Sequence, residues 1–341
     1  MDAKTVFALD FSRWKQRPLR LCFPEAEVRF VASLKAVPDG ATVAVWGRRE
    51  VPEVPARGLR VVRVEDGFLR SVGLGADLIR PLSWVVDGRG IYFDATRPSD
   101  LEVLLAETIF PAELLERAVA LRERIVAAGL TKYNVGTIPW RRPSGARRVV
   151  LVPGQVESDA SIAYGAPGIK TNLGLLQAVR QANPEAFVVY KPHPDVVAGL
   201  RAKGSGEDEA ARWCDAVVID APMGMLLDEV DEVHCLTSLT GFEALLRGNR
   251  VVCHGQPFYA GWGLTEDVQP VARRTRRLSL DALVAGALIL YPRYFNRRGD
   301  AVVSPEEALE ELIAWRRCKD DITPWWRKAF RVVLRRVVGV R

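Results

Sequence analysis

Residues 147–155 read RRVVLVPGQ, an apolar run that predicts a buried strand running into a turn. A helical pattern follows over residues 171–182, and AFVVYKPHP at 186–194 predicts another strand that ends in a loop. Short β-rich runs alternate with helical patterns in this way along the chain, which favours an α/β architecture with parallel sheets. Three later runs are expected to be strands of the same sheet: 215–220, 231–238 and 250–255.

The N-terminal half shows the same alternation before a stretch of different composition. Residues 41–47 and 59–67 predict buried strands that end at turns. Residues 99–129 carry apolar residues at helical spacing, with Ser99 as the expected cap. Residues 137–148 are rich in Pro, Gly and Arg and have no apolar period, so we interpret them as a linker between two domains.

A chain of 341 residues is long enough for two ordinary domains of about 150 residues each. We therefore predict two Rossmann-like, doubly wound domains that face a cleft. The first covers residues 1–140 and the second covers residues 149–315. Ligands in such sheets bind beyond the carboxyl ends of the strands, so polar residues that follow a strand are the first candidates for a site.

Composition excludes several classes of protein. The chain is 48% hydrophobic and 26% charged, as is typical of globular proteins. Its five cysteines are scattered and form no CxxC spacing, which argues against a disulfide framework or a zinc site and favours a reducing compartment. The sequence contains no signal-peptide pattern and no apolar run of the ~20 residues that span a bilayer. We therefore expect a cytoplasmic protein.

The net charge of +6 is concentrated at the C-terminus. Residues 325–341 contain six basic residues and no acidic one. Positive and negative charges therefore balance in the rest of the chain, which argues against a general nucleic-acid-binding protein. We predict a basic amphipathic tail over residues 316–341 that lies on the anionic inner surface of a membrane. The alternative is a helix docked on the protein's own core with a solvated basic face.

Two predicted strands end in residues suited to an anionic ligand. Lys191 and His193 lie in a turn stiffened by two prolines, where a lysine and a histidine can meet a phosphate. Ser238, Thr240 and Gly241 begin a predicted helix, whose hydroxyls and free N–H groups form an anion site. The alternatives are an ordinary Pro-rich turn in the first case and a simple helix cap in the second.

Acidic residues occupy other turns of this kind. Glu157 and Asp159 follow the strand at 147–155 and could provide a nucleophile, an acid/base or a metal pair, or Asp159 could cap the next segment. A metal is the weaker choice because no second acidic cluster lies nearby. Glu65 and Asp66 end a strand of the first domain, where they either form an ordinary turn or place a base opposite the second domain.

Two further features remain open. Glu243, one turn into the predicted helix, could meet ribose hydroxyls or could complement the helix dipole. The Gly-rich aromatic loop 255–263 suits a sugar or a base, and core packing beneath a loop is its equal alternative.

Taken together, four segments resemble the KpsC family of capsule proteins: 65–105, 151–162, 190–196 and 231–265. The match is most specific in EDGFLRS and in FYAGWG. The resemblance implies a GT-B-like fold and a retaining β-Kdo transferase that uses CMP-β-Kdo. Such enzymes build a poly-Kdo linker on a lysophosphatidylglycerol anchor, usually with two modules in tandem, of which this chain has room for one.

The resemblance also implies residue roles. Asp159 matches the carboxylate that takes the sugar covalently. Lys191 and His193 match the motif that binds the phosphate of CMP, and Ser238 and Thr240 match a hydroxyl pair near the same phosphate. Either Glu65 or Asp66 matches the acid/base, and the sequence does not decide between them. Gln155, Gly241 and Glu243 are assigned to the donor side as well.

The expected function is therefore Kdo transfer from CMP-Kdo to a Kdo-linked lysophosphatidylglycerol, by double displacement and without a metal or other cofactor. The enzyme is expected to lie peripherally on the inner membrane, with capsule assembly proteins as possible partners and no nucleic acid. Two alternatives stay open. One is an inverting CMP-sugar transferase similar to sialyltransferases, with Asp66 as direct base. The other is a non-catalytic component of capsule assembly or export.

Overall fold

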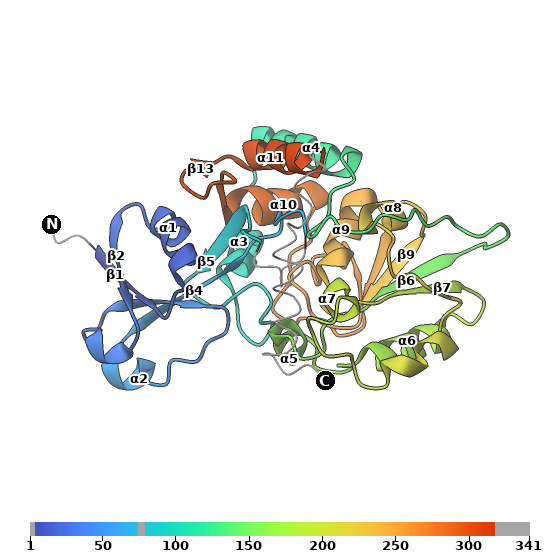
Figure 1. Cartoon of the computed structure of the whole chain (residues 1–341), viewed down its shortest axis with the longest axis horizontal. Helices are drawn as coiled ribbons and strands as arrows, with labels where there is room; N and C mark the ends of the chain where they lie inside the picture. Colours follow the sequence, from blue (N-terminus) through green and yellow to red (C-terminus); the bar gives the residue numbers. More distant parts are fainter. Residues whose placement is uncertain (1–3, 74–78, 318–341) are drawn as a thin grey trace.

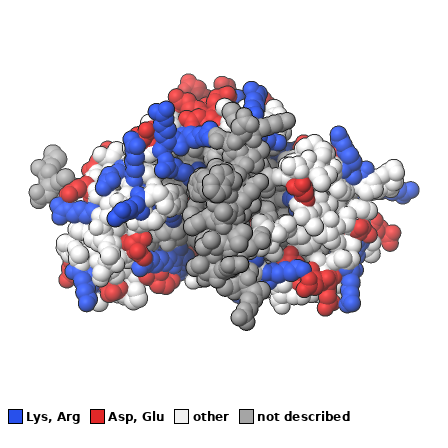
Figure 2. Space-filling model, in the orientation of Figure 1, with Lys and Arg blue, Asp and Glu red and all other residues white. Residues whose placement is uncertain are grey.

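The computed structural model of the protein describes residues 4–73 and 79–317, and the greater part of the predicted basic tail, residues 318–341, lies outside the described residues. The chain forms two lobes, each built on its own sheet and covered by helices (Figure 1). The prediction of an α/β fold with two sheets is confirmed. On the face shown in Figure 2, basic and acidic side chains are interspersed over both lobes.

The second sheet is entirely parallel, with the order β8-β7-β6-β9-β10-β11. Numbered along the chain, this is the 3-2-1-4-5-6 order of a Rossmann fold, which reverses between β6 and β9. The strands are β6 (Val149–Pro153), β7 (Phe187–Lys191), β8 (Ala216–Val217), β9 (Glu232–Cys235), β10 (Arg250–Cys253) and β11 (Glu266–Asp267). The intervening helices are α5 (Ala160–Gly165), α6 (Asn172–Ala182), α7 (Pro194–Val197), the 3-10 helix η3 (Glu207–Arg212), α8 (Met223–Leu227) and α9 (Leu239–Arg247).

The first sheet combines a parallel half with an antiparallel half. Strands β2, β1, β3 and β4 are parallel, whereas β5, β12 and β13 extend the sheet in antiparallel fashion. The strands are β1 (Lys4–Leu9), β2 (Ala26–Val31), β3 (Thr42–Trp46), β4 (Arg60–Asp66), β5 (Ser83–Asp87), β12 (Pro292–Phe295) and β13 (Val302–Val303). Helices α1 (Arg13–Cys22) and α2 (Val54–Arg57) lie on opposite sides of this sheet (Figure 1), and η1 (Leu34–Ala36) precedes β3.

The end of the described chain returns to the first lobe. Strand β12 pairs with β5, so residues 292–303, which the sequence placed with the second domain, belong to the first sheet. Helices α10 (Leu280–Val284) and η4 (Ala285–Leu290), which precede β12, and α11 (Pro305–Arg317), which follows β13, pack against α4 (Figure 1). Arg117 of α4 forms a two-pronged ion pair with Glu306 of α11, with an Nε–Oε1 distance of 2.7 Å. The long-range pairing of β12 has no local sequence signal.

The predicted helical stretch 99–129 is two helices, α3 (Asp100–Glu107) and α4 (Ala112–Ala127). Ser99 is the cap of α3 as predicted, since its hydroxyl accepts the N–H of Glu102 at 3.1 Å. The break falls before Pro111, because proline cannot donate the helical hydrogen bond and disfavours helical geometry in the residue before it.

The two segments that carry the strongest family resemblance pack on one another between the lobes. Phe68, in the loop after β4, stacks on Phe258, in the loop after β10, with ring centroids 4.5 Å apart. Phe242 of α9 completes this aromatic group. Tyr259 and Trp262 are fully buried, so these two residues of the aromatic loop serve core packing. The two lobes are therefore joined by an aromatic contact, of which Phe68 and Phe258 also line the cavity described next.

None of the helices within residues 4–73 and 79–317 is long and apolar enough to span a membrane.

Candidate active site

A cavity of about 410 Å³ lies between the two sheets. Its second-lobe wall is formed by the loops after β6, β7 and β9, which are the carboxyl ends on both sides of the point where the strand order reverses. Its first-lobe wall is formed by the ends of β3 and β4. This is where a doubly wound sheet binds its ligand. Predicted site residues that line it are Glu65, Gln155, Asp159, Lys191, His193, Ser238, Thr240 and Glu243.

Asp159 contributes an unengaged carboxylate to this cavity. The residue occupies the position before α5, but its side chain accepts no capping hydrogen bond, so the simple capping role is absent. No cation of the described residues forms an ion pair with it. Burial raises the pKa of Asp159, and the positive charges of Arg201 and Lys132 oppose that rise. The carboxylate of Asp159 therefore lines the cavity without an ion-pair partner among the described residues.

Glu157, the other acid of the same turn, has a structural role. Its two carboxylate oxygens accept the backbone N–H groups of Asn172 at 2.7 Å and Ser205 at 2.8 Å. It does not line the cavity. Within residues 4–73 and 79–317, no group of three or more His, Cys, Asp or Glu residues is arranged to hold a metal ion.

His193 presents a neutral hydrogen-bond donor. Its Nδ1 accepts the backbone N–H of Asp195 at 3.2 Å, which leaves the proton on Nε2. Burial, together with the charges of Lys132 and Arg201, lowers the pKa of His193 to about 4, so the ring is neutral near pH 7. Lys191 also lines the cavity, but its ammonium donates to the carbonyl of Ile219 at 3.1 Å.

The start of α9 forms the remaining part of the second-lobe wall. The Ser238 hydroxyl accepts the N–H of Thr240 at 3.2 Å and remains able to donate its own proton. The side-chain amide of Gln155 is held by Thr237. Its Nε2 donates to the Thr237 hydroxyl at 2.9 Å, and its Oε1 accepts the Thr237 N–H at 2.9 Å. Gln155 thereby ties the loop after β6 to the loop after β9 across the reversal point.

Gly241 does not line the cavity, and the structure gives its small size a packing reason. A Cβ atom at this position would overlap the Tyr259 hydroxyl and approach the Cys235 sulfur to 2.9 Å. The Tyr259 hydroxyl donates to the carbonyl of Ser238 at 2.5 Å, so the contact supports the start of α9.

Replacing Gly241 with alanine is expected to reduce the free energy of unfolding by about 1–3 kcal/mol, because the added methyl group overpacks a buried contact. Gly88→Ala is the matched control, since its Cβ atom would meet only the Asp100 carboxylate at an ordinary 3.5 Å. Urea denaturation of both variants measures the difference. An unchanged midpoint for Gly241→Ala would contradict this packing role.

Glu65 and Asp66, which the sequence left undecided, have different surroundings. Asp66 is paired with Arg70 at 2.7 Å and does not line the cavity. Glu65 lines the cavity and forms no ion pair with the described residues. Burial, reinforced by the neighbouring charge of Asp66, raises the pKa of Glu65 to about 7. A carboxyl group with this pKa is suited to proton transfer near neutral pH.

Sequence reasoning missed the segment 131–135, which crosses between the lobes and lines the cavity with five residues. Its Lys132 N–H donates to Glu243 of α9 at 2.6 Å, and the Tyr133 ring meets His193 edge-on at 6.0 Å. Glu243 therefore positions this segment. The segment follows a helix. The expectation that site residues follow the carboxyl ends of strands therefore did not point to it.

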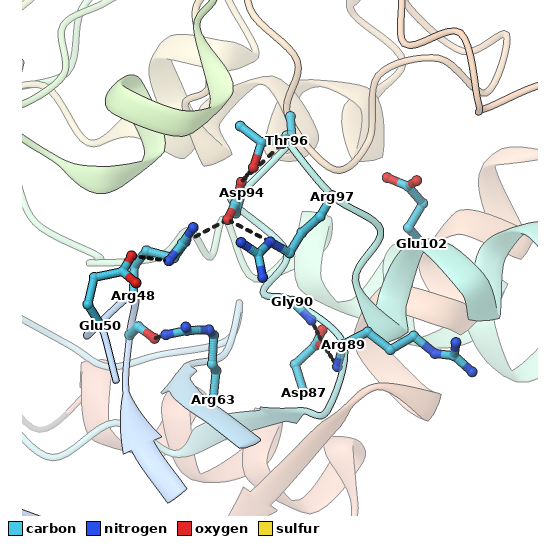
Figure 3. Close-up of polar contacts among 12 residues, drawn as sticks. Arg48, Glu50, Arg63, Asp87, Arg89, Gly90, Asp94, Thr96, Arg97 and Glu102 are labelled. Atoms are coloured by element: carbon cyan, nitrogen blue, oxygen red, sulfur yellow. Dashed lines mark hydrogen bonds and ion pairs between the residues drawn. The ribbon is translucent and has the colours of Figure 1, made fainter. Parts of the chain in front are cut away.

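A polar cluster of the first lobe gathers around Asp94, which contacts Arg48, Thr96 and Arg97 (Figure 3). Arg48, two residues after β3, forms an ion pair with the buried Asp94 at 2.7 Å. Its guanidinium also lies 4.7 Å from the ring centroid of Tyr164 on α5 in the second lobe. The backbone of Ala95 also donates to the carbonyl of Tyr164 at 3.2 Å. These contacts fix the first lobe against the helix that follows Asp159.

The two Rossmann-like sheets and the cavity between their strand ends define a GT-B-like architecture. The sequence matches the family described as capsule polysaccharide biosynthesis protein over residues 42–141 and 140–294. The chain belongs to this family, and its resemblance to the KpsC proteins is confirmed.

Individual relatives agree with this assignment. The chain is similar to two solved parts of KpsC from Thermosulfurimonas dismutans. The part titled beta Kdo 2,7 transferase is 39% identical with a TM-score of 0.75, and 92% of this chain covers 100% of it. The part titled beta Kdo 2,4 transferase is 34% identical with a TM-score of 0.79, and 92% of this chain covers 99% of it.

Among curated proteins, the chain is 43% identical over 318 residues to the capsule polysaccharide modification protein LipA of Neisseria meningitidis serogroup A. The match covers 90% of this chain and 45% of LipA, so the chain spans less than half the length of that relative.

Proposed function

We propose that this chain is a retaining glycosyltransferase that moves Kdo from CMP-β-Kdo to a Kdo-terminated glycolipid during synthesis of a capsule linker. The observation that carries the proposal is the pair Asp159 and Glu65. They line one cavity from opposite sheets, and neither is neutralised by an ion pair among the described residues. The titles of the two KpsC structures support the choice of sugar.

In the first step, the carboxylate of Asp159 attacks the anomeric carbon C2 of the donor sugar, and the bond from C2 to the phosphate oxygen breaks. The electron pair of that bond leaves with CMP, so the leaving group needs no proton. It needs hydrogen-bond donors, which the His193 Nε2–H and the hydroxyls of Ser238 and Thr240 supply. The product of this step is a covalent Kdo–Asp159 ester.

In the second step, Glu65 accepts the proton of an acceptor hydroxyl, and the hydroxyl oxygen attacks C2 from the face that CMP has left. The bond from C2 to Asp159 breaks, and its electron pair returns to the carboxylate. Two inversions at C2 preserve the β configuration. Glu65 approaches from the first lobe, so the proposal places the acceptor there and the donor on the second lobe.

The acceptor and the location are parts of the same proposal. We assign the acceptor as a Kdo-linked lysophosphatidylglycerol at the cytoplasmic face of the inner membrane, with capsule assembly proteins as partners. The capsule family of the chain and the composition of residues 316–341 support this assignment. No step of the mechanism calls for a metal ion.

The pH dependence of transfer is expected to follow Glu65. Only its carboxylate form accepts a proton, and its pKa is about 7, so kcat/KM for the acceptor should rise with pH and level off above 7. Below 7 the rate should fall about tenfold per pH unit. Initial rates of CMP release across pH measure this. Asp66→Asn should keep the acidic limb but shift it to lower pH, because the charge of Asp66 contributes to the raised pKa of Glu65. Persistence of the limb in Glu65→Gln would exclude Glu65 as the base.

The reaction itself is tested with CMP-Kdo and a synthetic Kdo acceptor, followed by NMR of the product anomer. A β-linked product supports retention. An α-linked product would favour the inverting alternative, and absence of any transfer would favour a non-catalytic capsule component.

A further inference from the structure

Lys132 is fixed in the cavity by both lobes. Its backbone N–H donates to Glu243 of the second lobe at 2.6 Å, and its carbonyl accepts the N–H of Ser71 in the first lobe at 3.4 Å. Tyr133, the next residue, also bonds to the first lobe, because its carbonyl accepts the N–H of Gly73 at 2.7 Å. Lys132 therefore holds a defined position on the cavity wall where the two lobes meet.

The ammonium group of Lys132 has no acidic partner within ion-pair distance in residues 4–73 and 79–317. Its charge nevertheless acts on the two proposed catalytic carboxylates. Burial raises the pKa of Asp159 and of Glu65, and Lys132 opposes the rise in each case. A half-buried cation that lines the same cavity as these two carboxylates, and forms an ion pair with neither, is available to an anionic ligand.

The other cations of the cavity are placed differently. Lys191 donates to the carbonyl of Ile219, at the side of the sheet that carries β8. Arg201 is exposed and acts on His193, the residue proposed to meet the phosphate of CMP. Lys132 alone of these three acts on both Asp159 and Glu65.

The chemistry of the donor creates a need for such a cation. Kdo is a 2-keto sugar acid, so its anomeric carbon carries a carboxylate directly. The attacking carboxylate of Asp159 must approach this second carboxylate, and two like charges at contact distance repel each other strongly in a partly buried site. A cation between them reduces the repulsion and also selects sugars that carry the acid group.

Building on the proposed function, we propose that Lys132 binds the carboxylate on the anomeric carbon of the donor sugar and is a specificity-determining residue of this site. Its ammonium donates hydrogen bonds to that carboxylate while Asp159 approaches C2. CMP, which lacks the sugar, makes no contact with Lys132.

The test compares Lys132→Met, which keeps the length of the side chain and removes the charge, with Lys132→Arg and with Lys170→Met as an exposed control. Initial rates give kcat/KM for CMP-Kdo, and product inhibition gives Ki for CMP. A lost charge-assisted hydrogen bond predicts a fall in kcat/KM on the order of 10- to 100-fold for Lys132→Met. Ki for CMP should stay within about twofold of the wild type, and Lys132→Arg should recover part of the loss.

Two results would overturn the inference while leaving the proposed function intact. In one, the wild type transfers Kdo and Lys132→Met has the same kcat/KM for CMP-Kdo as the wild type. The other is an equal loss in kcat/KM and in CMP affinity, which would indicate a general disturbance of the cavity. Absence of turnover by the wild type with CMP-Kdo would instead overturn the proposed function and this inference with it.

Discussion

Replacing Asp159 with asparagine is expected to reduce Kdo transfer by about 10⁴-fold, because the amide cannot form the covalent intermediate on which double displacement depends. The change is nearly isosteric, and the carboxylate makes no hydrogen bond that supports the fold of the described residues. Thermal stability should therefore stay close to that of the wild type. The measurement is CMP release with a synthetic Kdo acceptor, with the melting temperature recorded in parallel.

Glu157→Gln is the matched control, since it changes the other acid of the same turn. Glu157 holds the N–H groups of Asn172 and Ser205 and lies outside the cavity lining. This variant should lose stability by about 1–2 kcal/mol and retain most of its activity per folded molecule. If Asp159→Asn kept more than a tenth of wild-type activity, Asp159 would not be the nucleophile.

The second large effect is expected at Glu65. Glu65→Gln should lower transfer to an acceptor hydroxyl by about 10²- to 10⁴-fold, because the general base is lost. Glu65 forms no ion pair with the described residues, so the fold should tolerate the neutral amide. Initial transfer rates at pH 8, where Glu65 is ionised in the wild type, provide the comparison.

Asp66→Asn separates the two neighbouring acids. It leaves the buried Arg70 without its partner at 2.7 Å, which should cost on the order of 3 kcal/mol in the free energy of unfolding. Activity per folded molecule should fall much less than in Glu65→Gln. The opposite ranking, with Asp66→Asn inactive and stable, would assign the base to Asp66.

Much of the fold could be predicted because its signals are local. The apolar runs that became β3, β4, β6, β7, β9 and β10 all end within a residue or two of a turn that the sequence shows. The return of β12 to the first sheet could not be predicted in this way. That strand pairs with β5, more than two hundred residues earlier in the chain, and the intervening helices α10 and η4 pack on α4.

The residues of the candidate site also differ in whether a local sequence signal predicts them. Asp159, His193 and Ser238 lie in the connections that follow parallel strands. Parallel strands end at one edge of a sheet, so the meeting of these residues was predictable. The different surroundings of Glu65 and Asp66 were not predictable, because they depend on the ion pair between Arg70 and Asp66.

Lys132 and Gly241 show why a position after a strand does not by itself identify a site residue. Lys132 lies in a crossover after a helix and reaches the cavity through contacts with both lobes. Gly241 begins a helix at the correct strand end, yet its lack of a side chain serves the Tyr259 contact. A residue's place in the chain indicates which edge of a sheet it reaches, whereas the cavity it faces depends on packing from distant segments.

Double displacement requires a covalent Kdo intermediate on Asp159. Incubating Glu65→Gln with CMP-Kdo, without acceptor, should trap that intermediate, because the first step needs no base and the second step does. Peptide mass spectrometry is then expected to find one Kdo residue on the peptide that contains Asp159, and none in Asp159→Asn. An unmodified peptide in Glu65→Gln, with CMP-Kdo transfer still measurable in the wild type, would contradict double displacement at Asp159.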